Sequence, residues 1–128
     1  MPAFPVQPRL EKRLDSGNLA RILFNALTEK QAEDIVILDL RPVSLMADYF
    51  VIATGGSTRQ LKVLLETVMD AARLEADLKP LGVEGDSASG WVLVDFADVV
   101  VHVFDEDHRE YYSLEDAWSE APLVARMR

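Results

Sequence analysis

Cysteine is absent from the 128-residue sequence. This absence excludes disulfide bonds, thiol catalysis and cysteine-ligated zinc, and it is typical of proteins from a reducing compartment. We therefore expect a cytoplasmic protein. Histidine is scarce as well, with only His102 and His108 present. The two lie in different expected elements, a spacing that does not suit a metal ion, so no metal site is predicted.

Long apolar runs are also absent, and basic residues are fewer than acidic ones. No run approaches the roughly 20 residues that cross a membrane, and the first residues lack the order of a signal peptide, so we expect neither membrane association nor export. The 13 Lys and Arg are outnumbered by 22 Asp and Glu, and the net charge is −9. Because nucleic-acid affinity comes largely from basic side chains, nucleic acid is not the expected main contact. A basic protein surface suits this charge better, although acidity can also serve solubility alone.

The chain length is that of a single domain. Three prolines, at positions 2, 5 and 8, predict a disordered lead-in over residues 1–12, because proline sustains neither helix nor strand. We assign the folded domain to residues 13–122 and a C-terminal tail to residues 123–128.

A hairpin over residues 91–104 organises the predicted fold. Two β-branched apolar runs, at 91–94 and 99–104, flank the turn at 95–98. The second run is apolar on both faces, which is typical of an inner strand. Because side chains alternate along a strand, Trp91 shares a face with Asp95, and His102 shares one with Phe104.

The rest of the chain alternates predicted helices and strands. Apolar residues at helical spacing predict a helix from Ser16 to near Gln31 and a longer one between the 55–58 turn and Pro80. Short apolar runs predict strands at 35–40, 49–54 and 81–83, the last two parallel because the long helix connects them. Acids at 105–107 and Ser113 predict two short helices before Pro122. The order indicates an α/β fold.

Two sequence patterns could indicate a nucleotide-binding or catalytic site. The 55–58 turn, Gly-Gly-Ser-Thr, opens a helix and could bind an anion on free amides, but it lacks the P-loop lysine and the third glycine of a dinucleotide site. Asp95 and Asp98 could hold magnesium as in nucleotidyltransferases, but they do not form an Asp-x-Asp pair. A structural turn with a Ser or Thr cap is the preferred explanation of the first pattern. We expect no enzyme, and keep a nucleotidyltransferase-like nucleotide-binding enzyme as the alternative function.

Five segments together resemble the ribosomal silencing factors, also called Iojap-like proteins. They are residues 47–55, 79–85, 91–95, 98–104 and 109–115, followed by Trp118. The resemblance implies a nucleotidyltransferase-like α/β fold with a mixed five-stranded sheet, no enzymatic role, no cofactor and a tendency to form homodimers. It also implies binding to the large ribosomal subunit through its ribosomal protein fourteen, which blocks joining of the small subunit and represses translation in slow growth or starvation.

The resemblance also implies a set of partner-binding residues. Two aromatic residues are expected as apolar anchors and two acids as partners of Lys or Arg; the full set is Trp91, Asp95, Asp98, His102, Tyr111 and Leu114. The chain departs from the family pattern at Ala97, where glycine is usual, which argues against a left-handed turn residue there. It also departs at the 55–57 turn, where Gly-Thr-Ser is usual.

Overall fold

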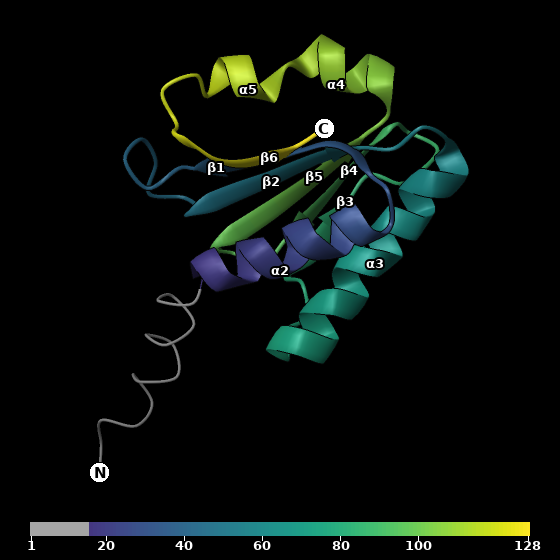
Figure 1. The fold of residues 1–128 in the computed structure, drawn as a ribbon, viewed down its shortest axis with the longest axis horizontal. Helices are drawn as coiled ribbons and strands as arrows, with labels where there is room; N and C mark the ends of the chain where they lie inside the picture. The colour runs from purple at the N-terminus through teal and green to yellow at the C-terminus, as the bar shows by residue number, and fades with distance from the viewer. Residues whose placement is uncertain (1–15) are drawn as a thin grey trace.

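A six-stranded mixed sheet lies between two pairs of helices in the computed structural model, which describes residues 16–128 (Figure 1). The strands are β1 (Glu33–Asp39), β2 (Tyr49–Thr54), β3 (Gly82–Glu84), β4 (Trp91–Asp95), β5 (Val99–Phe104) and β6 (Leu123–Met127). The helices are α2 (Ser16–Glu29), α3 (Thr58–Ala76), α4 (Glu106–Tyr112) and α5 (Leu114–Ala117). The predicted lead-in over residues 1–12 lies outside the described residues.

The strand order is β3-β4-β5-β2-β1-β6. The β4–β5 hairpin is confirmed, and β5 is an inner strand that pairs antiparallel with β4 and parallel with β2. All other neighbouring pairs are antiparallel. It follows that β2 and β3 run in the same direction, as predicted, although two other strands separate them.

All five predicted strands are present, but the predicted strand count is one too low, and the prediction of a tail over residues 123–128 is wrong. Leu123–Met127 form β6, which pairs antiparallel with β1, with Met127 opposite Ile35 and Ala125 opposite Ile37. Four of its five side chains are exposed, so the strand carries no apolar alternation that a sequence pattern could reveal. The free edge of β1 supplies the pairing, and tertiary context therefore decides the state of this segment.

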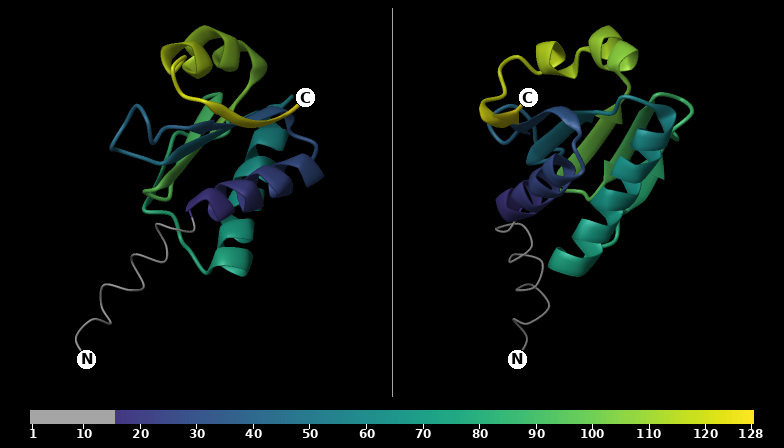
Figure 2. Two further views of the ribbon diagram at one scale, coloured as in Figure 1. Left: turned by 60° about the vertical axis from the view of Figure 1, so that its left-hand side comes forward. Right: turned by 45° about the vertical axis from the view of Figure 1, so that its right-hand side comes forward.

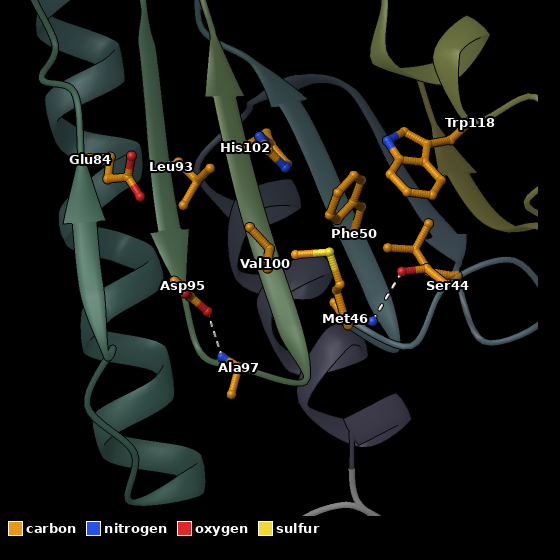
Figure 3. A pocket seen from close by; sticks show the side chains of 12 residues that line it. Ser44, Met46, Phe50, Glu84, Leu93, Asp95, Ala97, Val100, His102 and Trp118 are labelled. Carbon is orange, nitrogen blue, oxygen red and sulfur yellow. Dashed lines mark hydrogen bonds between the residues drawn. The ribbon is translucent and has the colours of Figure 1, made fainter.

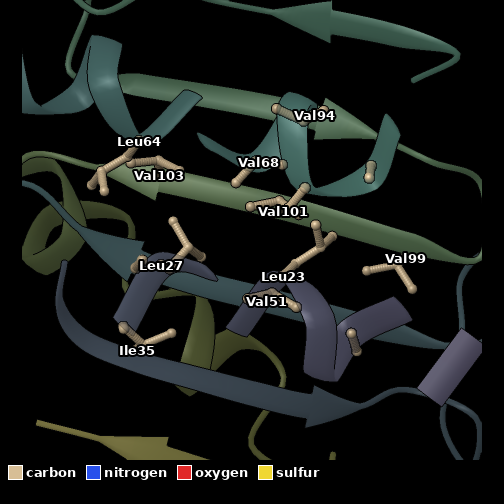
Figure 4. Close-up of a cluster of buried hydrophobic side chains, with 14 of the residues drawn as sticks. Leu23, Leu27, Ile35, Val51, Leu64, Val68, Val94, Val99, Val101 and Val103 are labelled. Carbon is tan, nitrogen blue, oxygen red and sulfur yellow. The ribbon is translucent and has the colours of Figure 1, made fainter. Parts of the chain in front are cut away.

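The two sheet faces carry separate apolar clusters. Helices α2 and α3 cover one face and the α4–α5 segment lies over the other (Figure 2). The first cluster packs Leu23 and Leu27 of α2, and Leu64 and Val68 of α3, against the strands (Figure 4). The second cluster is smaller. Because side chains alternate, β5 gives Val99, Val101 and Val103 to the first cluster and Phe104 to the second.

The hairpin turn contradicts the expectation about Ala97, whose φ of 72° lies in the left-handed region. Two hydrogen bonds impose this conformation. The Ala97 amide donates to Asp95 Oδ1 at 2.7 Å, and the Phe96 amide donates to the Val99 carbonyl at 2.9 Å. An alanine therefore occupies a position that favours glycine.

The two short helices are confirmed, and they begin in different ways. Asp105, one of the acids that predicted the start of α4, is its N-cap, since its carboxylate accepts from the His108 amide at 2.8 Å. Ser113 precedes α5 but its side chain makes no capping bond; its hydroxyl donates to Asp116 Oδ2 at 2.6 Å instead. The reason is that Ser113 also ends α4 in a left-handed conformation, which prevents it from acting as an ordinary N-cap.

Candidate functional site

A groove of about 320 Å³ lies on the sheet face opposite α2 and α3 (Figure 3). Its floor consists of two rows of side chains that are neighbours in the strand pairing. One row runs from β3 through β4 to β5, and the other runs from β4 through β5 to β2. The first row is Glu84, Leu93 and His102, and the second is Asp95, Val100 and Phe50. Met46 and Trp118 line it from the loop after β1 and the end of α5. The floor is therefore mainly apolar, with two carboxylates at the β3–β4 side.

His102 is the most deeply buried polar residue of this floor, with 4% of its surface exposed. The Trp91 Nε1–H donates to His102 Nδ1 at 3.2 Å, so the proton of the neutral imidazole resides on Nε2. Burial lowers the pKa of His102 to about 4, and the ring is neutral at physiological pH. Among residues 16–128, nothing accepts a hydrogen bond from Nε2.

Aromatic rings surround His102. The Trp91 ring stacks on Phe104 at 5.0 Å between centroids and lies 4.5 Å from Tyr112. On the other side, the Phe50 ring meets His102 edge to face at 4.5 Å and Trp118 at 5.6 Å. Such pairs stabilise beyond the area they bury. The α4–α5 segment is thus attached to the sheet by a ring at the end of each helix, Tyr112 for α4 and Trp118 for α5.

Arg109 fixes the same segment electrostatically. Its guanidinium donates to the Asp34 carbonyl and to Thr54 Oγ1, both at 2.8 Å, and to Glu115 Oε2 at 2.7 Å. A β-bulge in β1 and a positive φ at Asp34 present that carbonyl. The Asp34 carboxylate also pairs with Arg126 of β6 at 2.9 Å. One arginine thereby connects α4 and α5 to the central strands.

The parts of the alternative nucleotide site lie far apart. In the parallel β2–β5 pair, Tyr49 is opposite Val99 and Thr54 opposite Phe104, so the Gly55–Ser57 turn and the Asp95–Asp98 turn lie at opposite ends. Five residue steps of about 3.3 Å separate them by roughly 16 Å. Two amides at the start of α3 are also engaged, because the Gly56 amide donates to Gln60 Oε1 at 2.6 Å and the Gln60 amide donates to Ser57 Oγ at 3.0 Å.

The six predicted partner-binding residues divide into three groups. Asp95 and His102 line the groove, and Trp91 lies beside it in contact with His102. Leu114 packs against the second apolar cluster, while Tyr111 is 80% exposed on α4. Asp98 does not line the groove; its carbonyl accepts from the Asp48 and Tyr49 amides at 2.8 and 3.1 Å.

The prediction missed several groove residues, namely Phe50, Glu84, Leu93, Val100 and Trp118. Strand alternation gave a usable signal for two of them, because Leu93 shares a face with Asp95 and Val100 shares one with His102. No sequence signal was available for Glu84, whose position depends on the pairing of β3 with β4.

Within residues 16–128, no cluster of acids and histidines could hold a metal ion. The same part of the chain contains no helix that is long and apolar enough to cross a membrane. The fold and the groove thus define an acidic α/β domain with a site suited to binding. The residues that could form a nucleotidyl-transfer site are not brought together.

Comparison with known proteins gives the family. The family model described as "Ribosomal silencing factor during starvation" matches residues 13–127. A curated ribosomal silencing factor from Bacillus subtilis is 42% identical over 111 residues, which cover 87% of this chain and 93% of that protein. The chain belongs to the ribosomal silencing factor family, as its motifs indicated.

Two further relatives extend the comparison. A crystal structure from Chromobacterium violaceum is similar, with a TM-score of 0.76 and 35% identity, covering 80% of this chain and 85% of that one. A mouse protein named "Mitochondrial assembly of ribosomal large subunit protein 1" is 33% identical over 100 residues, which cover 77% of this chain and 44% of the mouse protein. The fold is therefore shared with a solved structure, and the sequence similarity extends to a mitochondrial protein.

Proposed function

We propose that this protein binds the large ribosomal subunit through ribosomal protein fourteen and sterically blocks association with the small subunit. Translation would fall in slow growth or starvation as a result. The family match over residues 13–127 carries the proposal, because it connects nearly the whole described chain to silencing factors. The net charge of −9 supports it, since a ribosomal protein embedded in RNA presents a basic surface.

The docking surface in this proposal is the sheet face with the groove, together with α4. Tyr111 supplies an exposed apolar anchor, and Asp95 and Asp98 pair with basic side chains of the partner. Trp91, His102 and Leu114 support this surface from beneath, because they are half-buried or buried under it. The mechanism is occupancy of an intersubunit contact. It therefore needs no cofactor and no turnover, and the protein acts in the cytoplasm, as a homodimer when free.

Sedimentation with purified ribosomal subunits tests the proposal. The protein is expected to travel with the large subunit, and the joined-ribosome peak is expected to shrink as its concentration rises. A protein that stays at the top of the gradient would overturn the proposal. Calorimetry with magnesium and each nucleoside triphosphate then tests the nucleotide-binding alternative.

A pair of variants locates the surface. Tyr111→Ala removes an anchor that is 80% exposed, whereas Leu74→Ala removes an apolar side chain that is 71% exposed on α3, which covers the opposite face. We expect Tyr111→Ala to weaken subunit binding about tenfold or more, and Leu74→Ala to leave it unchanged. Equal effects would place the docking surface elsewhere.

A further inference from the structure

The groove has an acidic side and an aromatic side. Glu84 of β3 and Asp95 of β4 lie at one side, and the rings of Phe50 and Trp118 lie at the other (Figure 3). Glu84 is opposite Leu93 in the ladder, so Glu84 and Asp95 are diagonal neighbours on one face, about 7–8 Å apart. A single cation can therefore contact both carboxylates.

The carboxylates of the groove lack basic partners. Neither Glu84 nor Asp95 forms an ion pair with a Lys or Arg of residues 16–128, and the groove lining from this range contains no basic residue other than His102. His102 is neutral at physiological pH because it is buried. The groove therefore keeps both negative charges uncompensated and attracts a cation.

His102 gives an independent indication of a ligand. Its Nε2–H is buried under the groove without an acceptor, whereas buried donors in folded proteins are almost always paired. In Figure 3 its ring lies between Leu93 and Phe50, on the groove side of the sheet. An acceptor brought in by a partner, such as a backbone carbonyl, would satisfy this donor.

We propose that the groove recognises a basic protein segment in which an apolar side chain is close to a lysine or arginine. The apolar side chain packs on Phe50, Val100 and Trp118, and the cation lies between Glu84 and Asp95. A carbonyl of the same segment accepts from His102 Nε2–H. This inference rests on the proposed function, because the segment belongs to the protein component of the large subunit that this chain contacts.

Binding of labelled protein to purified large subunits, at low and moderate salt, tests the inference. Glu84→Gln and Asp95→Asn each remove one charge, and Asn keeps the acceptor that holds the Ala97 amide. The control is Glu66→Gln on α3, an exposed acid on the helix covering the other face. We expect each groove variant to weaken binding about threefold, and the double variant about tenfold with a smaller salt dependence.

A second pair of variants tests the apolar part of the groove. Val100→Lys places a cation on the floor and is expected to abolish binding, whereas Val63→Lys places one on exposed α3 as a matched control. If the wild type binds subunits and the double acid variant binds like Glu66→Gln, the groove inference is wrong while the proposed function stands. If the wild type does not bind subunits, both are wrong.

Discussion

Acidification should destabilise this protein through His102 well before its carboxyl groups titrate. The ring is buried, and burial lowers its pKa to about 4, whereas an unfolded histidine has a pKa of about 6.5. Between these two values the unfolded chain binds more protons than the folded chain. Stability is therefore complete above about pH 6.5 and falls as the pH drops toward 4.

The size of the effect follows from the two pKa values. Between about pH 7.5 and pH 5, the free energy of unfolding should fall by about 2 kcal/mol, since each pH unit spent between the two pKa values contributes about 1.4 kcal/mol. A pH near 5 is suitable because most carboxyl groups are still ionised there. The expected loss is a sizeable fraction of the stability of a small domain.

Urea unfolding followed by far-UV circular dichroism at the two pH values measures this loss. The comparison variant is His102→Gln, whose amide oxygen can accept from Trp91 Nε1 but does not titrate. The difference between the two proteins cancels the pH dependence that comes from all the groups they share. If wild type and His102→Gln lose the same stability on acidification, the buried neutral state of His102 does not set the pH dependence, and the reasoning is refuted.

Three further substitutions have expected effects on the free energy of unfolding, measured in the same way. Arg109→Ala should cost about 3 kcal/mol, because it leaves Glu115 and the Asp34 carbonyl without their donor; a loss below ~1 kcal/mol would show that the α4–α5 segment is held by its rings. Ala97→Gly should stabilise by about 1 kcal/mol, because φ is 72°; no gain would mean that the turn relaxes around alanine. Gly90→Ala should cost about 2 kcal/mol, because φ is +84° and a Cβ would meet the Asp105 carboxylate; a neutral result would contradict that close approach.

The arrangement of helices and inner strands could be predicted from the sequence because these elements have strong periodic patterns. The Leu61–Leu64–Val68 stripe places one face of α3 in the core, and the apolar run of β5 marks an inner strand. β6 could not be predicted, because its side chains are mostly exposed and only its pairing with β1 makes it a strand.

The candidate site was only partly predictable, for a different physical reason. Alternation assigned Asp95 and His102 to faces of their own strands. The register between β4 and β5 is needed to show that the Asp95 face of β4 and the His102 face of β5 form one groove. The parallel pairing of β2 with β5 is needed to show that Gly55 and Asp98 lie at opposite ends of the strands. The pairing of strands that are distant in sequence cannot be predicted from the sequence of either strand alone.

The sheet separates two apolar clusters, and this has a consequence for how the sequence can change. Substitutions under α2 and α3, at positions such as Leu23 or Val68, do not contact the groove side chains on the other face. Effects at distant sites without shared partners are usually additive. Variation in the first cluster can therefore raise or lower stability while the side chains of the groove face are preserved.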